Sequence, residues 1–412
     1  MSNRPTGTGG KQADAVYNND MPYMTLRVSI LLALFCAPAL YAAPVVDKPQ
    51  LRAAAARAEK PVRRDWTVMA YFNGKNDLSN DLIDSLNELE RAGSSRRVNV
   101  VAELGLAPGS KAGWKGVRRF YVTKDADVSR INSDQLSRLS SADMGSPKHL
   151  ENFVAWTKKN YPADRYLLLV LTHGAGAAGL SPDSASGNSI SVAGFARALE
   201  KTGGVDVLLL QSCYMQTAEL AGELRGLAGA VVASQERSYT GAHDLKKIVN
   251  ILRHTPGMDG KAAARKTLDN FLAPSNTNSL LLPEKTAALE AALSAWVDAA
   301  TAAAEKDALA QAALDVRRFG KPEQCDLAHF IQLANAKTLS PQAKQAGEAA
   351  LAALAEAVPQ NKVNYGKNVN GLSIYMPPGG AMAESYAGSA FAKRSGWLKL
   401  INWMNAHNAF NP

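Results

Sequence analysis

The sequence predicts an α/β fold organised around a mainly parallel β-sheet, and two features of the hydrophobic pattern support this prediction. The first is a series of short, near-continuous apolar runs at residues 66–72, 98–104, 166–172 and 205–210. Such runs are typical of strands that are buried on both faces of a parallel sheet. The second is that helical patterns separate these runs, at residues 80–91, 147–160 and 191–201. A chain that alternates strand and helix forms right-handed βαβ units, which place helices on both faces of the sheet.

The predicted elements of the sheet region carry local signals of their own. The helix at 80–91 has leucine and isoleucine on one face, and Gly93 suits the position that follows a helix. Ser191 is a suitable N-cap for the third helix. A further strand is predicted at 231–233. We therefore assign residues 66–241 to one α/β core.

Beyond residue 241 the chain is rich in helix-forming residues. Alanine, glutamate, lysine and apolar residues predict helices at 262–272, 284–314 and 391–404. The segment 371–377 returns to strand character and is predicted to pair with the sheet. We assign 242–412 to a helix-rich C-terminal part that returns this one strand to the core.

The N-terminal segment is predicted to be a signal peptide over residues 1–42. An apolar run at 28–40 follows Arg27 and ends in small residues, and it is too short to span a bilayer comfortably. An uncleaved anchor is the alternative. No later stretch is long and apolar enough to span a membrane, so the mature protein is expected to be secreted or periplasmic. Residues 43–65, rich in Ala, Arg, Lys and Pro, are interpreted as a linker or pro-segment.

The charge of the chain does not indicate a nucleic-acid partner. The net charge is +9, of which +1 lies in residues 1–42 and +3 in 43–65, which leaves +5 for the remaining residues. This excess is modest, and no nucleic-acid-binding motif accompanies it. The sequence does not indicate an oligomeric state.

Three cysteines are present, and one of them is a candidate for chemistry. Cys36 lies in the predicted signal peptide, and two remaining cysteines do not make a disulfide framework. Cys325 precedes an apolar helical start and is predicted to be a small buried side chain. Cys213, in contrast, lies at the carboxyl end of the buried strand 205–210, after Gln211 and Ser212. The carboxyl ends of parallel strands are where α/β sheets place their ligands.

A histidine stands at the corresponding end of another strand. His173 follows the apolar run 166–172 and precedes Gly174. Because both strand ends lie at one edge of a parallel sheet, His173 and Cys213 are expected to meet there. A thiol and an imidazole are the minimum for cysteine nucleophilic catalysis. The helix after Cys213 is expected to favour the thiolate.

The loop after His173, residues 174–187, is rich in glycine and is predicted to be a flexible rim of the site. It lacks the Lys-Ser/Thr ending of a phosphate-binding loop. A small-molecule binder that uses this loop is a weaker alternative.

Together these motifs resemble the caspase-like cysteine peptidases, in which one apolar strand ends in His-Gly and a later one ends in cysteine. Three further segments resemble the clostripain family in particular, in the same order along the chain. They are Trp66–Leu78, Val232–Glu236 and Gly371–Pro377. The resemblance implies a caspase-like fold for residues 66–241 and an endopeptidase activity on peptides or proteins.

The residues that would carry this activity follow from the motifs and the resemblance together. Cys213 would attack the scissile carbonyl and form a thioester acyl-enzyme, and His173 would act as the acid–base partner. Gly174 lacks a Cβ, so a carbonyl oxygen can approach its backbone N–H, and the Cys213 N–H would be the second oxyanion donor.

Substrate preference is the point at which the sequence departs from the resemblance. Clostripain-like sequences usually have an aspartate two positions before the cysteine, which favours Arg or Lys at P1, the residue before the scissile bond. Here that position is Gln211, and a neutral amide cannot neutralise a buried guanidinium. Glu236 and Asp244 are the acidic candidates that could restore a basic preference.

The resemblance also implies a calcium requirement for some members of the family. No compact EF-hand-like loop of oxygen ligands is found in the sequence, so we name no metal ligands and no certain cofactor. Two alternatives to a peptidase remain open. One is a catalytically silent member that binds peptides, and the other is a cysteine amidase that acts on cell-wall peptides.

Overall fold

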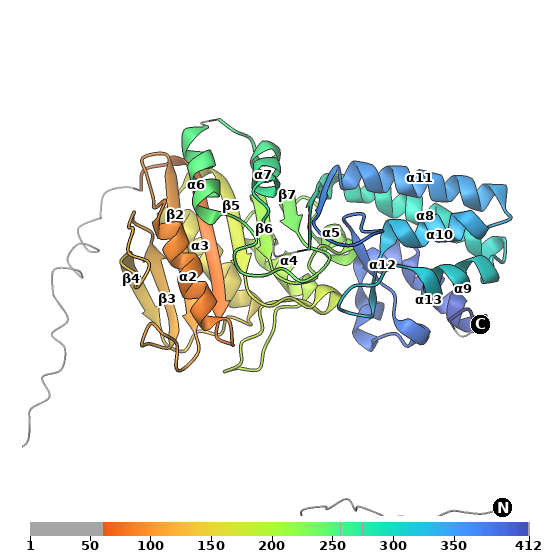
Figure 1. Cartoon of the computed structure of the whole chain (residues 1–412), viewed down its shortest axis with the longest axis horizontal. Helices are drawn as coiled ribbons and strands as arrows, with labels where there is room; N and C mark the ends of the chain where they lie inside the picture. Colours follow the sequence, from red (N-terminus) through yellow and green to blue (C-terminus); the bar gives the residue numbers. More distant parts are fainter. Residues whose placement is uncertain (1–60, 256, 273–275, 411–412) are drawn as a thin grey trace, which may run out of the picture. The chain divides into compact units, whose positions relative to one another are not determined.

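The computed structural model describes residues 61–255, 257–272 and 276–410, all within the compact unit Gln50–Pro412 (Figure 1). The predicted signal peptide at 1–42, and the predicted linker up to residue 60, lie outside the described residues. No helix among the described residues has the length and apolar character needed to cross a membrane.

A nine-stranded sheet forms the centre of the described chain, in the order β10-β8-β7-β6-β5-β1-β2-β3-β4. Its five middle strands, from β7 to β2, pair in parallel, and the outer strands pair antiparallel. This confirms the predicted α/β fold with a mainly parallel sheet. The strands are β1 (Arg64–Gly74), β2 (Val98–Leu106), β3 (Gly116–Tyr121), β4 (Asp134–Leu139), β5 (Ala163–Leu171), β6 (Val205–Gln211), β7 (Ala228–Ala233), β8 (Thr277–Leu281) and β10 (Gln360–Val363).

Helices cover both faces of this sheet because the central strands are apolar on both sides. In β5, Leu167 and Leu169 belong to one buried cluster and Leu168 and Val170 to another. The first cluster is shared with α2 (Ser79–Glu90), α6 (Leu245–His254) and α7 (Gly260–Asp269). The second is shared with α3 (Pro147–Asn160), α4 (Val192–Lys201), α5 (Ala218–Glu223) and helices of the C-terminal part. Ser191 caps α4 as predicted, since its side chain accepts a hydrogen bond from the Gly194 N–H.

The C-terminal part contributes a group of helices that continue the second cluster. The helix predicted at 284–314 forms as two, and Ala304, with a φ of 54°, lies in the break between them. The helix predicted at 391–404 is also divided, at Gly396, whose φ is 70°. These helices are α8 (Thr286–Ala302), α9 (Lys306–Asp315), α10 (Leu327–Lys337), α11 (Pro341–Ala357), α12 (Ala390–Arg394) and α13 (Trp397–Ala406).

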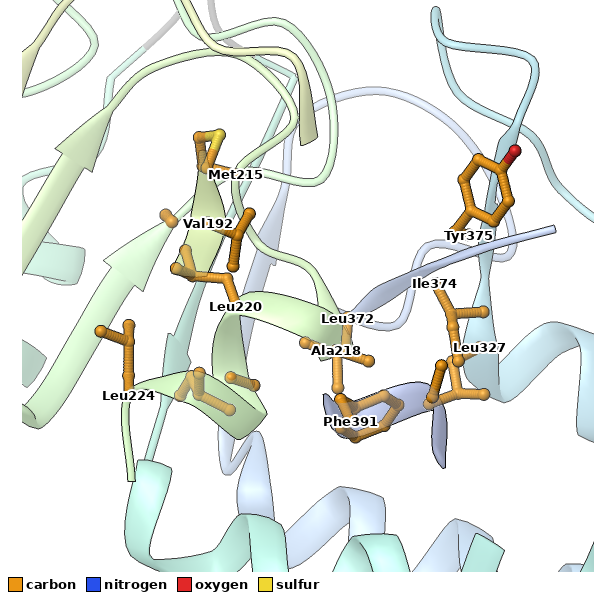
Figure 2. Close-up of a cluster of buried hydrophobic side chains, with 14 of the residues drawn as sticks. Val192, Met215, Ala218, Leu220, Leu224, Leu327, Leu372, Ile374, Tyr375 and Phe391 are labelled. Atoms are coloured by element: carbon orange, nitrogen blue, oxygen red, sulfur yellow. The ribbon is translucent and has the colours of Figure 1, made fainter. Parts of the chain in front are cut away.

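The prediction that 371–377 pairs with the central sheet is wrong. Its strand, β11 (Ser373–Tyr375), pairs antiparallel with β9 (Gln324–Asp326) in a separate two-stranded sheet. The sheet edge beyond β7 is already occupied by β8 and then β10, two strands of the C-terminal part that were not predicted. Residues around β11 still enter the core, where Leu372 and Ile374 lie in one cluster with Phe391 of α12 (Figure 2).

Candidate active site

His173 and Cys213 leave the sheet at equivalent points of two neighbouring strands. The last paired residues of β5 and β6 are Leu171 and Gln211, and His173 and Cys213 each follow two residues later. Side chains alternate between the faces of a strand, so residues two apart emerge on the same side. On β5 and β6 this is the side covered by α2, α6 and α7. His173 and Cys213 therefore follow the same edge of the sheet on neighbouring strands.

Gly174 lies directly against the backbone of Cys213. A Cβ atom placed on Gly174 would lie 2.3 Å from the Cys213 carbonyl oxygen and 3.1 Å from the Cys213 nitrogen. Only glycine permits this approach, because an atom at 2.3 Å would force the backbone to shift. Within the described residues, neither the Gly174 N–H nor the Cys213 N–H donates a backbone hydrogen bond. Two donors thus remain available beside the thiol.

The Cys213 thiol is partly buried against the backbone of Ser238. The Ser238 N–H donates to Cys213 Sγ at 3.4 Å, and the thiol donates to the Ser238 carbonyl oxygen at 3.5 Å. Burial raises the pKa of the Cys213 thiol, whereas the Ser238 N–H and the nearby Arg237 guanidinium lower it by less. The helix expected to favour the thiolate, α5, begins only at Ala218 and has its first turn capped by Thr217. The resting cysteine is therefore better described as a thiol, contrary to the sequence-based expectation.

His173 is bonded to a residue that the sequence analysis did not single out. Its Nε2 atom lies 2.6 Å from Oδ1 of Asp77, in the loop between β1 and α2. The hydrogen bond from His173 is the main reason that the pKa of the Asp77 carboxyl is lowered. The signal was present in the sequence, since Asp77 follows the apolar run 66–72 as His173 follows its own run. A polar residue after a parallel strand lies at the same edge as the other strand ends.

Of the three proposed substrate-binding residues, Gln211 and Glu236 lie next to the cysteine. Gln211 is buried, and its Nε2 donates to the Tyr239 carbonyl oxygen at 3.0 Å. Its Oε1 atom is buried without a hydrogen-bond partner among the described residues. The buried Glu236 carboxylate accepts hydrogen bonds from the N–H groups of Arg237 and Gly320, both at 3.1 Å.

Asp244 has a different local role. Its side chain accepts a hydrogen bond from the Lys247 N–H at 2.7 Å and so caps the N-terminus of α6. A carboxylate at this position is stabilised by the orphan N–H groups and the dipole of the helix. Capping accounts for the presence of an acidic residue at this position.

The C-terminal part supplies one wall of the site, which the sequence did not indicate. Phe319 and Val369 form a small apolar cluster with Tyr214, and Cys213 packs against it. Arg237 donates from Nε to the Tyr214 hydroxyl at 3.1 Å. The wall therefore combines aromatic surface with one exposed guanidinium on the loop that touches the thiol.

The glycine-rich rim, residues 174–187, is anchored by polar contacts rather than free. Lys75 forms a buried ion pair with Asp183 at 2.7 Å, and Asp183 also accepts from the Met144 N–H at 2.9 Å. Asn73 donates to the Ser181 hydroxyl at 2.9 Å. These bonds tie the rim to the loop that carries Asp77.

Other chemical features of the described residues lie apart from this site. Cys325 is fully buried, as predicted, and burial raises the pKa of its thiol. Cys213 and Cys325 are both free cysteines. In the described ranges, no group of three or more His, Cys, Asp or Glu side chains is arranged to hold a metal ion.

Comparison with known proteins identifies the family. The model of the clostripain family, peptidase family C11, matches residues 70–318, more than half of the chain. Clostripain of Hathewaya histolytica is 23% identical over 241 residues, which cover 48% of this chain and 45% of clostripain. The match therefore spans less than half the length of that relative.

Solved structures agree with this assignment at the level of the fold. A secreted C11 cysteine protease from Bacteroides thetaiotaomicron, in complex with an irreversible peptide inhibitor, has a TM-score of 0.61 at 17% identity. The similarity covers 81% of this chain and 99% of that one. An inactive zymogen C11 protease from Parabacteroides distasonis has a TM-score of 0.61 at 21% identity and covers 83% and 98%. The resemblance noted in the sequence is confirmed, and the chain belongs to the clostripain family of cysteine peptidases.

Proposed function

We propose that this chain is a cysteine endopeptidase whose nucleophile is Cys213 and whose acid–base group is His173. The observation that carries the proposal is the placement of the two residues at equivalent strand ends, with Gly174 packed on the Cys213 backbone. Among the described residues, no other histidine follows a parallel strand whose neighbour leads to a cysteine.

The reaction follows from the groups at this edge. Cys213 gives its proton to the imidazole, and its sulfur forms a bond to the scissile carbonyl carbon. The negative charge on the carbonyl oxygen is stabilised by the N–H groups of Gly174 and Cys213. The C–N bond then breaks, and the protonated imidazole gives its proton to the leaving amine. Water hydrolyses the resulting thioester and restores the thiol.

The charges around the thiol support little preference for basic P1 residues. Gln211 is neutral, the Glu236 carboxylate already accepts two backbone N–H groups, and Asp244 caps a helix. The exposed guanidinium of Arg237 lies close enough to the thiol to lower its pKa. A lysine or arginine entering here would meet the like charge of Arg237, and the nearest carboxylate, that of Glu236, already accepts two hydrogen bonds at Oε1.

We further propose that the mature protein is secreted or periplasmic and is released by cleavage near residue 42. The apolar run at 28–40 supports this, and one neighbour in structure is described as secreted. N-terminal sequencing of the exported protein tests it. An N-terminus that still includes residues 28–40 would contradict the proposal.

The central experiment is labelling with a thiol-reactive peptide ketone, followed by mass spectrometry. Wild type and Cys325→Ala are expected to be labelled once, at Cys213, and Cys213→Ala is expected to remain unlabelled. Cys325→Ala is the matched control because it removes the other free cysteine of the described chain. Labelling that survives in Cys213→Ala would refute the assignment of the nucleophile.

Cleavage of a positional-scanning peptide library, with and without a calcium chelator, then tests the activity and the substrate preference together. We expect cleavage with little preference for Arg or Lys at P1. Peptide binding without cleavage would indicate the silent alternative, and cleavage restricted to muropeptides would indicate the amidase. Loss of cleavage with the chelator would establish the calcium requirement that the family resemblance implies.

A further inference from the structure

We propose that Asp77 is a positioning residue that fixes the orientation and tautomer of His173, so that Nδ1 is the ring nitrogen that exchanges protons during catalysis. The inference rests on the proposed function of His173 as the acid–base group. It adds a third member to the Cys213–His173 pair.

The tautomer follows from the hydrogen-bonding capacity of the two partners. Nε2 of His173 lies 2.6 Å from Oδ1 of Asp77. An ionised carboxylate only accepts hydrogen bonds, so the proton of a neutral imidazole must reside on Nε2. The other nitrogen, Nδ1, then carries the lone pair that can receive a proton from the thiol. The lowered pKa of Asp77 is consistent with an ionised carboxylate at neutral pH.

The loop that carries Asp77 is held in place independently of His173. Asn76 accepts a hydrogen bond from the Leu78 N–H at 3.0 Å and donates to the Pro182 carbonyl oxygen at 3.1 Å. These two bonds fix the backbone on either side of Asp77. The carboxylate is thus presented from a fixed segment of the chain.

The same network holds the strand end that carries the imidazole. Thr172, the residue before His173, donates from its hydroxyl to the Asn73 carbonyl oxygen at 3.2 Å. The His173 carbonyl oxygen in turn accepts from the Ser181 N–H at 3.0 Å. Both partners of the Asp77–His173 bond are therefore anchored through their backbones. The bond is not needed to hold the backbone in place, and its effect is to orient the imidazole ring.

The Asp77–His173 pair is too exposed to contribute much to the stability of the fold. The Asp77 side chain is 80% exposed and the His173 side chain 39% exposed. Ion pairs at such exposure contribute little to stability because water screens them. Substitution of Asp77 should consequently leave the protein folded while it releases the imidazole.

The test uses three substitutions at Asp77 and one matched control. Asp77→Ala removes the acceptor, Asp77→Asn keeps a neutral acceptor, and Asp77→Glu keeps a charged one. Asp81→Asn removes the same charge four residues away, from the exposed first turn of α2. With the full-length protein, kcat and KM for a cleaved peptide are measured, along with the protonated ring nitrogen by NMR of ¹⁵N-labelled histidine.

We expect kcat to fall roughly tenfold in Asp77→Ala, with KM little changed, because only the orientation of the acid–base group is lost. The kcat of Asp77→Asn should fall by less, and the kcat of Asp77→Glu should lie between those of Asp77→Ala and wild type. The kcat of Asp81→Asn should equal that of wild type. The His173 signal, assigned from a His173→Gln variant, should show the single proton of the neutral ring on Nε2 in wild type and a mixture of the Nε2 and Nδ1 tautomers in Asp77→Ala.

Two results would overturn the proposal. One is an unchanged ring-nitrogen pattern in Asp77→Ala, and the other is an equal loss of kcat in Asp81→Asn. The NMR measurement does not depend on peptide cleavage. If wild type cleaves no peptide but the nitrogen pattern changes as expected, the proposed function fails while the positioning by Asp77 stands.

Discussion

The thiol of Cys213 is held between the two backbone polar groups of Ser238. The Ser238 N–H lies 3.4 Å from the sulfur, and the Ser238 carbonyl oxygen accepts from it at 3.5 Å. The Cys213 thiol is therefore in contact with the loop that follows β7. A substrate carbonyl that reaches the sulfur must approach it beside these two groups. The protonation state of the thiol before substrate binds can be measured directly.

The first prediction concerns the reactivity of this thiol as a function of pH. Burial raises the pKa of Cys213, so the thiolate fraction at pH 7 is smaller than for a free cysteine. The rate of alkylation by iodoacetamide should rise with pH and reach its midpoint above the free-cysteine value of about 8.5. The measurement is mass spectrometry of the Cys325→Ala variant over pH 6–10. A midpoint below the free value would mean that the neighbouring N–H and Arg237 outweigh burial.

A second prediction tests the close approach of Gly174 to Cys213. Gly174→Ala would place a Cβ 2.3 Å from the Cys213 carbonyl oxygen, so one strand end must move. We expect kcat/KM to fall by about 100-fold or more, since small misplacements of reacting groups carry losses of this order. The fold should lose about 1–3 kcal/mol of unfolding free energy, as is usual for overpacking.

Gly388→Ala is the matched control for this substitution. A Cβ at Gly388 meets no atom within 4 Å, and neither glycine has a positive φ. Activity and urea unfolding of the two variants should therefore differ sharply. Equal kcat/KM in both variants would show that the strand ends are not as closely packed as described.

The strand ends of the site could be predicted because strands that are buried on both faces of a parallel sheet have near-continuous apolar sequences. Such a run marks the end of a strand to within about a residue: the runs 166–172 and 205–210 correspond to β5 ending at Leu171 and β6 ending at Gln211. The neighbouring strands therefore lead to His173 and Cys213 at one edge of the sheet. The strands β8 and β10 were missed for the opposite reason. They pair antiparallel at the edge, begin with polar residues, and depend on distant partners rather than on a local pattern.

The parts of the site that were missed are contacts without a sequence signature. Ser238 touches the thiol with its backbone, which any residue type could do. Phe319 and Val369 reach Cys213 from the C-terminal part, far along the chain. Asp77 is the exception, because its position after the apolar run 66–72 was a signal in the sequence. Only the anchoring of its loop and its bond to His173 distinguish this exposed acid from a solvated charge.

The third prediction concerns a substitution that adds a negative charge at Gln211, two positions before Cys213. Gln211→Asp would introduce a carboxylate on the same side of the strand as Cys213, and it would remove the amide that donates to the Tyr239 carbonyl. We expect the relative rate for Arg and Lys at P1 to rise at least tenfold over wild type, because the new charge can pair with a guanidinium or ammonium group.

The loss of the amide donor needs its own control. Gln211→Leu also removes the bond to Tyr239 but adds no charge, so it should lower stability without any gain for basic residues. The Tyr239 carbonyl oxygen keeps a hydrogen bond from the Ala242 N–H at 3.1 Å, so Gln211→Leu should lose about 0.5–1.5 kcal/mol, the usual contribution of one hydrogen bond. Gln211→Asp should lose more, because it also buries a charge. The readout is a P1 positional scan beside thermal unfolding. A gain for Arg in both variants would assign the effect to loosening of the loop rather than to charge.

The fourth prediction concerns a buried acid that joins the α/β core to the C-terminal part. Glu219 of α5 accepts hydrogen bonds at Oε1 from the Tyr375 N–H at 2.9 Å and the Tyr386 hydroxyl at 2.8 Å. Its Oε2 atom has no partner among the described residues, and burial raises the pKa of the carboxyl. Because the folded pKa lies above the unfolded value, the stability from this group is present in acid. It is lost as the pH rises through the folded pKa.

Glu219→Gln should remove this pH dependence. The glutamine oxygen can accept the same two hydrogen bonds, and no charge needs to be buried at neutral pH. At pH 7.5 we expect the variant to be as stable as wild type or more stable by about 1–3 kcal/mol, and at pH 4.5 the two should be nearly equal. Glu348→Gln, on the exposed face of α11, should leave the profile of wild type unchanged. Thermal unfolding at a series of pH values decides the point: a variant less stable than wild type at pH 7.5 would show that the charged carboxylate is needed to hold Tyr375 and Tyr386.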